Sequence, residues 1–320
     1  MQLLPRKRKK RKKDWFFIQK PLDKSGSLVY NSRNKCKNNE YLCKYSSKKG
    51  CFTMKKLIAL VLACLLVVSL FAACGDKTAA DTSLQDVLDK GQLVIGTSPD
   101  FPPFENLNDD GSITGIEIDI LTKICETLGV TLMIEQMDFD SVLPGVQAGK
   151  FDLAVSGITA TDERKQNALF TDPYCLANIA IVVKEGSDIA GKADLADKTV
   201  SLQTGTTAEL YCNANGFQNN AFQANADAQM ALTTGKVDAW IIDDLTAKDM
   251  VDAYNAEHDD KLVILDEAMT TEPYGFATKL GNETLIEEIN KILADLLANG
   301  TIKDLFAQYE ADFVDPATAA

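Results

Sequence analysis

The chain has 320 residues, of which 46% are apolar and 25% are charged, so its composition is that of a globular protein and excludes disorder throughout. Its formal charge of −13 averages two unlike segments. Residues 1–73 hold 18 Lys and Arg against 3 Asp and Glu, whereas residues 74–320 hold 15 against 43, a net charge of −28. Phosphate backbones would repel so acidic a domain, which argues against nucleic-acid binding.

The first eighty residues combine a basic tail with an export signal. Residues 54–73 read Met-Lys-Lys followed by an uncharged run, which is the order of a secretory signal peptide. A transmembrane anchor is the alternative, but spanning a bilayer takes about 20 apolar residues. Two alanines precede Cys74, and we expect a linker over 74–83. Residues 1–53 fit no export signal, and we interpret them as the product of an upstream start or as a disordered basic tail.

After the linker, compact apolar runs alternate with amphipathic helical stretches. Apolar residues recur at helical spacing over 118–128 up to the stop signal Gly129, and a terminal helix is expected from Asn282 to about Asn299. Strand and helix in alternation are typical of an α/β protein with largely parallel sheets. The expected strands are, in chain order, 93–95, 132–134, 153–155, 179–183, 199–202, 239–242 and 262–264.

About 245 residues of mature chain exceed the usual size of a single core, so we expect two lobes. Two extended runs, 178–183 and 274–278, are interpreted as the crossings between them. Lobe 1 would then be discontinuous, built from 84–182 and 276–315, and lobe 2 would be 183–275. Two strands that join two lobes make a hinge.

Cysteine and histidine contents restrict the chemistry of the exported part. Cys125, Cys175 and Cys212 remain once Cys74 is set aside, and an odd number predicts no obligatory disulfide framework. The single histidine, His258, lies in a polar stretch, where a solvated loop position is favoured over a base or metal ligand. Serine–histidine hydrolysis and histidine-rich metal sites are therefore disfavoured, and we expect no cofactor.

Two polar loops, 156–164 and 203–207, each follow a predicted strand and open a helix, the first with Thr161 as its N-cap. Helix N-termini present free N–H donors and the positive end of a dipole, so both loops favour a carboxylate. Ordinary strand-to-helix capping produces the same pattern, and taken singly each loop is explained by it.

Arg164 adds weight to the first loop, because it is the only arginine after residue 33. A planar guanidinium grips a carboxylate with two parallel hydrogen bonds, which an ammonium cannot do. The alternatives are a surface position or a structural ion pair with Asp162 or Asp172.

Carboxylates and aromatics supply further candidates. Asp243 and Asp244 end the strand 239–242, where ligands gather in open α/β sheets, and a carboxylate there could receive an ammonium group. Phe101 and Phe139 are expected in loops, where an aromatic needs a surface to cover, so each is as well explained by a pocket wall as by the core. For Phe104 the core is favoured.

The chain resembles the polar amino-acid branch of the type 2 solute-binding proteins that feed ABC importers, relatives of the glutamine- and histidine-binding proteins. The resemblance covers roughly 93–309 and is carried by 96–105, 115–119, 156–164 and 170–174. It implies an α/β, two-lobed type 2 periplasmic-binding-protein fold, each lobe a mostly parallel sheet flanked by helices, joined by two hinge strands. Residues 54–73 likewise resemble a bacterial lipoprotein signal, with Cys74 as the lipid-carrying residue.

The resemblance also implies a site that holds a free amino acid by both ends of its zwitterion. Ser98 is a departure, since several glutamine, histidine and lysine binders carry Asp there, and it leaves the identity of the bound amino acid open. The implied residues are Arg164, Thr159 and Thr207 at the α-carboxylate; Asp243, Gly157 and Ser156 at the α-ammonium; and Phe101, Phe139, Ser98 and Gln203 around the side chain. Thr206 is a further expected ligand-binding residue.

The function implied is hinged capture of a free L-amino acid outside the cytoplasm by a lipid-anchored, non-enzymatic protein that delivers it to the transmembrane subunits of an ABC permease. The alternative is a dehydratase on the same bilobal fold, which would need a general acid such as Glu105, Asp100 or Glu209. A receptor sensor lobe is a third reading, but it would require a second apolar span, and none follows residue 73.

Overall fold

Two β-sheets with flanking helices organise the computed structural model, which describes residues 80–319. These residues belong to one compact unit, Lys77–Ala320. The predicted signal peptide, the predicted tail over 1–53 and Cys74 lie outside the described residues. Within residues 80–319, no helix is long and apolar enough to cross a membrane.

The first sheet has five strands, and its parallel part is the run β5–β1–β6, in which Leu93 lies opposite Leu132. Strand β14 pairs antiparallel with both β6 and β7, because the chain enters it on its return from the second sheet. In spatial order the strands are β5 (Thr131–Gln136), β1 (Gln92–Thr97), β6 (Leu153–Ala154), β14 (Ala277–Lys279) and β7 (Ala168–Phe170).

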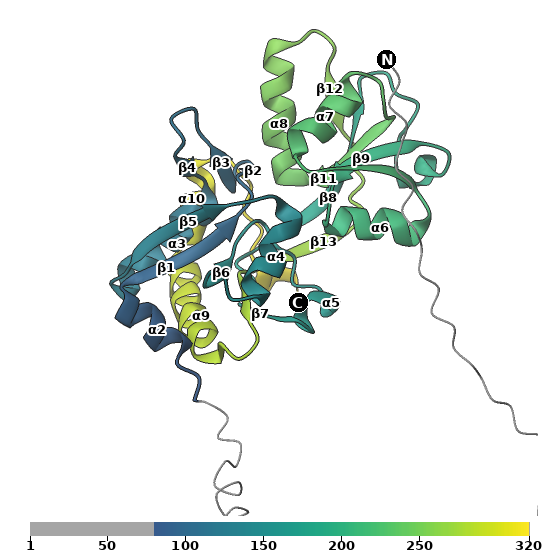
Figure 1. The fold of residues 1–320 in the computed structure, drawn as a ribbon. Helices are drawn as coiled ribbons and strands as arrows, with labels where there is room; N and C mark the ends of the chain where they lie inside the picture. The colour runs from purple at the N-terminus through teal and green to yellow at the C-terminus, as the bar shows by residue number, and fades with distance from the viewer. Residues whose placement is uncertain (1–79, 320) are drawn as a thin grey trace, which may run out of the picture. The chain divides into compact units, whose positions relative to one another are not determined.

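Helices cover both faces of this sheet (Figure 1). Successive side chains of a strand point to opposite faces. Accordingly Leu93 and Ile95 belong to a core shared with α3 and α9, whereas Val94 packs against the core on α4. The helices are α2 (Ser83–Lys90), α3 (Ile116–Leu128), α9 (Glu283–Ala298) and α10 (Thr301–Gln308) with the first core, and α4 (Phe139–Gln147) with the second.

The second sheet repeats this plan, with a parallel part β10–β9–β11 and with β8 antiparallel to β11, β12 and β13. Its strands are β10 (Gln218–Phe222), β9 (Thr199–Gln203), β11 (Ala239–Asp243), β8 (Cys175–Lys184), β12 (Leu262–Ile264) and β13 (Thr271–Tyr274). The prediction of mostly parallel sheets therefore describes the three strands at one side of each sheet, while the strands next to the crossings run antiparallel.

Residue alternation along β11 again separates two apolar layers. Ala239 and Ile241 face the core that includes α6 (Thr207–Asn215), and Trp240 and Ile242 face the core that includes α7 (Asn225–Thr233) and α8 (Asp244–Glu257). The remaining elements are the small sheet β2 (Asp100–Phe101), β3 (Glu105–Leu107) and β4 (Ile113–Thr114), helix α5 (Asp162–Lys165), and the 3-10 turns η1 (Lys192–Leu195) and η2 (Pro316–Ala319).

The chain passes between the sheets twice, over 171–174 and over 275–276. The passages lie side by side, since Thr171 N–H donates to Phe276 O at 2.8 Å and Tyr174 N–H donates to Tyr274 O at 3.0 Å. The interpretation of 178–183 as a crossing was wrong, because this run belongs to β8 and pairs within the second sheet, and the crossing precedes it. Below, lobe 1 means the first sheet and the small sheet with helices α2–α5, α9 and α10, and lobe 2 means the second sheet with α6–α8.

All seven expected strands are present, and α3 ends at Gly129, whose left-handed φ of 71° lets its N–H bond to Cys125 O. The loop assignments for Phe101 and Phe139 were wrong. Phe101 lies in the two-residue strand β2, too short to give a periodic signal, and Phe139 is the first residue of α4. Cys125, Cys175 and Cys212 are buried free thiols, and burial raises the pKa of Cys125 and Cys212 to about 11.

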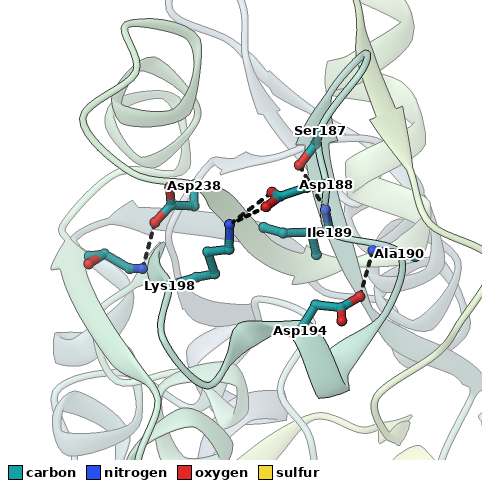
Figure 2. Close-up of polar contacts among 8 residues, drawn as sticks. Ser187, Asp188, Ile189, Ala190, Asp194, Lys198 and Asp238 are labelled. Carbon is teal, nitrogen blue, oxygen red and sulfur yellow. Dashed lines mark hydrogen bonds and ion pairs between the residues drawn. The ribbon is translucent and has the colours of Figure 1, made fainter.

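A polar cluster secures the turn between β8 and β9 (Figure 2). Lys198 Nζ contacts both carboxylate oxygens of Asp188 at 2.8 Å, and Asp238 accepts the Thr199 N–H at 2.8 Å. Asp238 precedes β11, so this bond fixes the starts of two neighbouring parallel strands at one edge. Their far ends carry Gln203 and Asp243, which the site uses.

Candidate ligand-binding site

One pocket gathers residues from segments far apart in the sequence and from both lobes. Ten of the eleven ligand residues expected from the sequence line it. The eleventh, Ser98, lines a neighbouring pocket together with Asp100 and Asp138. The ten are Phe101, Phe139, Ser156, Gly157, Thr159, Arg164, Gln203, Thr206, Thr207 and Asp243.

The first polar loop leaves β6 and enters α5, and Gly157 is its tightest point. Gly157 has a φ of 54°, in the left-handed region, and a Cβ there would lie 2.5 Å from the ring of Phe101. Its N–H donates to Glu117 Oε2 at 3.0 Å. The backbone at Gly157 is therefore held between an aromatic ring and a buried carboxylate.

Glu117, on the first turn of α3, is a residue that the sequence analysis missed. It is fully buried and accepts a second hydrogen bond, from Tyr174 Oη. Burial raises the pKa of Glu117 to about 7, although both hydrogen bonds oppose the rise. The available signal was a carboxylate between Ile116 and Ile118, on the buried face of an amphipathic helix.

Arg164 projects from α5 into the pocket. Thr161 caps this helix as predicted, its Oγ1 accepting the Arg164 N–H at 3.2 Å. The guanidinium donates to Thr159 O at 2.9 Å and, across to lobe 2, to Gly205 O at 3.0 Å, and it lies 6.0 Å from the centre of the Phe139 ring. Within residues 80–319 it forms no ion pair, which removes the structural pairing with Asp162 or Asp172 as an explanation.

Arg164 keeps its positive charge in this environment. Burial lowers the pKa of the guanidinium, and the negative charges of Glu272 and Asp243 oppose that change. Because the ordinary pKa of a guanidinium lies far above neutral pH, Arg164 stays protonated at physiological pH. Its neutral carbonyl partners leave the positive charge uncompensated by any direct ion pair.

The second polar loop joins β9 to α6 and is held by its own side chains. Thr206 Oγ1 accepts the Glu209 N–H at 3.3 Å, and Glu209 Oε2 accepts the Gly205 N–H at 2.7 Å, so the helix start is satisfied reciprocally. Thr207 is the first residue of the helix. This end of α6 directs backbone N–H groups and the positive end of its dipole to the pocket wall.

Asp243 and Asp244, which the sequence placed together, have different environments. Asp244 accepts hydrogen bonds from the N–H and the side-chain amide of Asn178, at 3.1 and 2.9 Å, and so ties α8 to β8. Asp243 makes no capping bond and lines the pocket. Burial, followed by the nearby charges of Glu272 and Asp244, raises the pKa of Asp243 to about 7. Of the two carboxylates, only Asp243 is positioned to meet a ligand.

The acids nominated for a dehydratase are placed elsewhere. Glu209 is bound to the Gly205 N–H, and Glu105 is fully buried with neither carboxylate oxygen hydrogen-bonded within the described residues. Asp100 lines the neighbouring pocket and contacts Gln203. None of the three lines the pocket that holds Arg164. Over residues 80–319 there is also no group of three or more His, Cys, Asp or Glu side chains placed to hold a metal ion.

Comparison with known proteins places this chain in a family. The model of the bacterial extracellular solute-binding proteins, family 3, matches residues 93–312. The chain belongs to this family. Among its family 3 relatives, the L-cystine-binding protein TcyJ of Escherichia coli (strain K12) is 30% identical over 245 residues, which cover 75% of this chain and 91% of TcyJ.

Solved structures agree with the family 3 assignment. A mutant of ArgBP from T. maritima is 35% identical with a TM-score of 0.66, over 72% of this chain and 100% of its own. The ancestral amino acid-binding protein AncCDT-1, a precursor of cyclohexadienyl dehydratase, is 32% identical with a TM-score of 0.65, over 71% of this chain and 99% of its own. The fold is therefore the two-lobed type 2 binding-protein fold that the resemblance implied.

Proposed function

We propose that this family 3 protein is the extracytoplasmic binding component of an ABC importer, which captures a free polar amino acid and delivers it to the permease. One observation carries the proposal: a guanidinium without an ion pair, Arg164 of lobe 1, and a half-buried carboxylate, Asp243 of lobe 2, line the same pocket. An amino acid carries the complementary pair of charges on one carbon atom.

The α-carboxylate would bind Arg164, with the backbone N–H groups of Thr159 and Thr207 assisting. An ionised acceptor forms shorter and stronger hydrogen bonds than the carbonyl groups that Arg164 now contacts. The α-ammonium would bind Asp243, with the Gly157 carbonyl and the Ser156 hydroxyl as further acceptors. The resulting ion pair would lower the pKa of Asp243 from about 7, so binding would release a proton near neutral pH.

Capture by hinge closure follows from the division of these residues between lobes. Arg164, Gly157 and Phe101 come from lobe 1, whereas Asp243 and Thr207 come from lobe 2. A ligand that contacts both lobes stabilises only the arrangement in which they are close, and the passages 171–174 and 275–276 are where the backbone would bend. Charge-assisted hydrogen bonds of about 1.5 to 3 kcal/mol each suffice for micromolar affinity, which requires about 8 kcal/mol.

The anchoring of the protein belongs to the same proposal. Export under the direction of residues 54–73 and lipidation of Cys74 would hold the binding domain at the outer face of the membrane, near the permease. Metabolic labelling with a radioactive fatty acid would test this step, because the label should enter the exported protein and should be absent from Cys74→Ala. Equal labelling of both proteins would refute it.

Screening the purified protein by thermal shift against the twenty amino acids and cystine, followed by calorimetry on each hit, tests the function itself. We expect at least one polar amino acid to raise the melting temperature and to bind with a dissociation constant near or below micromolar. Recovery of that amino acid unchanged after denaturation separates a binding protein from the dehydratase alternative. A flat screen would refute amino-acid capture, and a dehydrated product would favour the enzyme.

A further inference from the structure

We propose that Asp100 is a latch between the lobes, which sets how long the closed state lasts, and hence the affinity, without touching the bound amino acid. The inference rests on the proposed function for its effect on affinity, while the latch itself is a property of the protein alone. It is built from four residues: Asp100 and Ser98 of lobe 1, and Gln203 and Asn225 of lobe 2.

The Asp100 carboxylate bridges the two lobes through both oxygens. Oδ2 accepts the Asn225 N–H at 2.9 Å and the Gln203 side-chain amide at 3.1 Å, both from lobe 2. Oδ1 accepts the hydroxyl of Ser98 at 2.8 Å, which fixes the carboxylate on lobe 1. The Asn225 side-chain amide completes the contact by donating to Asp100 O at 3.3 Å and to Gln203 Oε1 at 3.2 Å.

Lobe 2 has a helix end that needs such a partner. Asn225 is the first residue of α7, and the N-cap position is Ala224, which has no side-chain oxygen to accept the free N–H groups of the first turn. Asp100 supplies the missing acceptor from the other lobe and places a negative charge at the positive end of the helix dipole. The cap exists only while the lobes are close, so α7 loses it when they separate.

Asp100 stands apart from the pocket that would hold the amino acid. That pocket is lined by Arg164 and Asp243 but not by Asp100, which lines the neighbouring pocket with Ser98 and Asp138. Gln203 lines the amino-acid pocket and is held in place by Asp100, so Asp100 acts as a positioning residue. Removing it should therefore speed dissociation, while the docking of the amino acid on Arg164 is left intact.

The first experiment measures the latch without any ligand. Hydrogen exchange at the Asn225 amide is followed in the full chain for the wild type, Asp100→Ala and the control Asp138→Asn. Asp138 lines the same pocket as Asp100 and carries the same charge, but it makes no capping bond. We expect exchange at Asn225 to be about tenfold faster in Asp100→Ala, the factor for one lost hydrogen bond to a charged group, and unchanged in Asp138→Asn.

A second pair of variants isolates the single N–H group. Asn225→Ala and Asn225→Pro both lack the side-chain amide, but only the proline variant lacks the backbone donor. Proline is favoured at the first position of a helix, and Ala224, with φ −107° and ψ 144°, already has the extended conformation required before proline. The two variants should fold alike, which melting curves can verify. They differ at the contact with Asp100, because proline removes the N–H donor and places its ring carbon Cδ against the Asp100 carboxylate in the closed state.

Stopped-flow binding of L-arginine, L-histidine and L-cystine as probes measures the consequence. We expect Asn225→Pro to release whichever probe binds at least about tenfold faster than Asn225→Ala, with the same association rate. Equal exchange at Asn225 in Asp100→Ala and wild type, or equal release by the two Asn225 variants, would overturn the latch. An association rate constant that is much lower in Asp100→Ala than in the wild type would also overturn the latch, because Asp100 would then contact the ligand. If no amino acid of the thermal-shift screen binds while exchange at Asn225 changes as expected, the proposed function is refuted and the latch stands.

Discussion

The two polar loops that meet at the pocket look alike in sequence but are supported in opposite ways. The loop 156–164 is fixed by buried contacts. Ser156 and Thr159 are 2% and 6% exposed, and the Gly157 N–H donates a hydrogen bond to the buried Glu117. The loop 203–207 has an exposed glycine. It is held at its start by Thr204, which donates to Phe222 O of β10, and at its end by bonds within the helix start, from Thr206 and Glu209. The first loop therefore rests on a buried carboxylate, whereas the second is fixed by a neighbouring strand and by its own helix cap.

This difference indicates that the two loops contribute to ligand binding at different stages. A charge that must grip a ligand in the open state requires a rigid setting, and Arg164 has one because its loop is built into lobe 1. The second loop contacts the ligand only after lobe 2 has closed, so its local backbone conformation matters more than anchoring in the core of its lobe. Substitutions in the first loop should therefore have larger effects than matched substitutions in the second.

The largest effect is expected at Arg164. Arg164→Ala would leave the ligand carboxylate without its cation in a site removed from water, a loss of several kcal/mol that takes a micromolar complex beyond detection. Arg164→Lys keeps the charge but not the planar fork and should recover only part of the affinity. Lys165→Ala, at the exposed next position, is the control and should bind normally. Calorimetry that finds the wild-type affinity in Arg164→Ala would contradict the assignment.

Glu117, which anchors the first loop, should make the free energy of unfolding depend on pH. The folded-state pKa of Glu117 is raised from 4.5 to about 7, so its favourable contribution is fully present below pH 4.5 and is lost as pH rises through about 7. The loss is about 3 kcal/mol. Glu117→Gln can keep both hydrogen bonds, accepting from Gly157 and donating to Tyr174, and should remove this part of the slope.

Denaturant titrations between pH 4.5 and 7 measure that slope. Glu126→Gln, at an exposed position of the same helix, is the matched control and should leave it unchanged. Asp243 has a similarly raised pKa, so part of the wild-type slope should remain in Glu117→Gln. Parallel curves for the wild type and Glu117→Gln would mean that Glu117 is ionised throughout this range.

A smaller loss is expected when a Cβ is added to the first loop. Gly157→Ala must accommodate both a left-handed φ and a methyl group 2.5 Å from the Phe101 ring, whereas Gly216→Ala has a φ of 74° with nothing within 4 Å. The backbone strain alone costs about 1 to 2 kcal/mol, so the difference between the variants reports the clash with Phe101, about 1 to 3 kcal/mol more. Equal losses in unfolding free energy would show that Phe101 moves aside freely.

Local patterns in the sequence were enough to predict seven of the strands, helices α3 and α9, and most of the residues that line the pocket. Thr161 and Thr206 were readable as parts of helix starts, because capping needs only a few consecutive residues, and Arg164 was conspicuous as a solitary arginine. Glu117 and Asp100 were not assigned these roles. Their partners lie 40 and 125 residues away, at Gly157 and Asn225, and no periodicity or spacing encodes which distant backbone N–H a carboxylate will meet.

The smallest effect is expected in the second loop. Thr206→Ala removes the acceptor of the Glu209 N–H and should cost about 1 kcal/mol of unfolding free energy, the usual value of an N-cap. Glu209 still binds the Gly205 N–H, so the helix start frays without being lost. Thr161→Ala removes the same type of cap from α5, but there the capped N–H is that of Arg164, so this variant should also weaken amino-acid binding. If calorimetry finds that Thr206→Ala weakens binding more than Thr161→Ala does, the rigid half of the site lies in lobe 2, and the contrast drawn between the two loops is reversed.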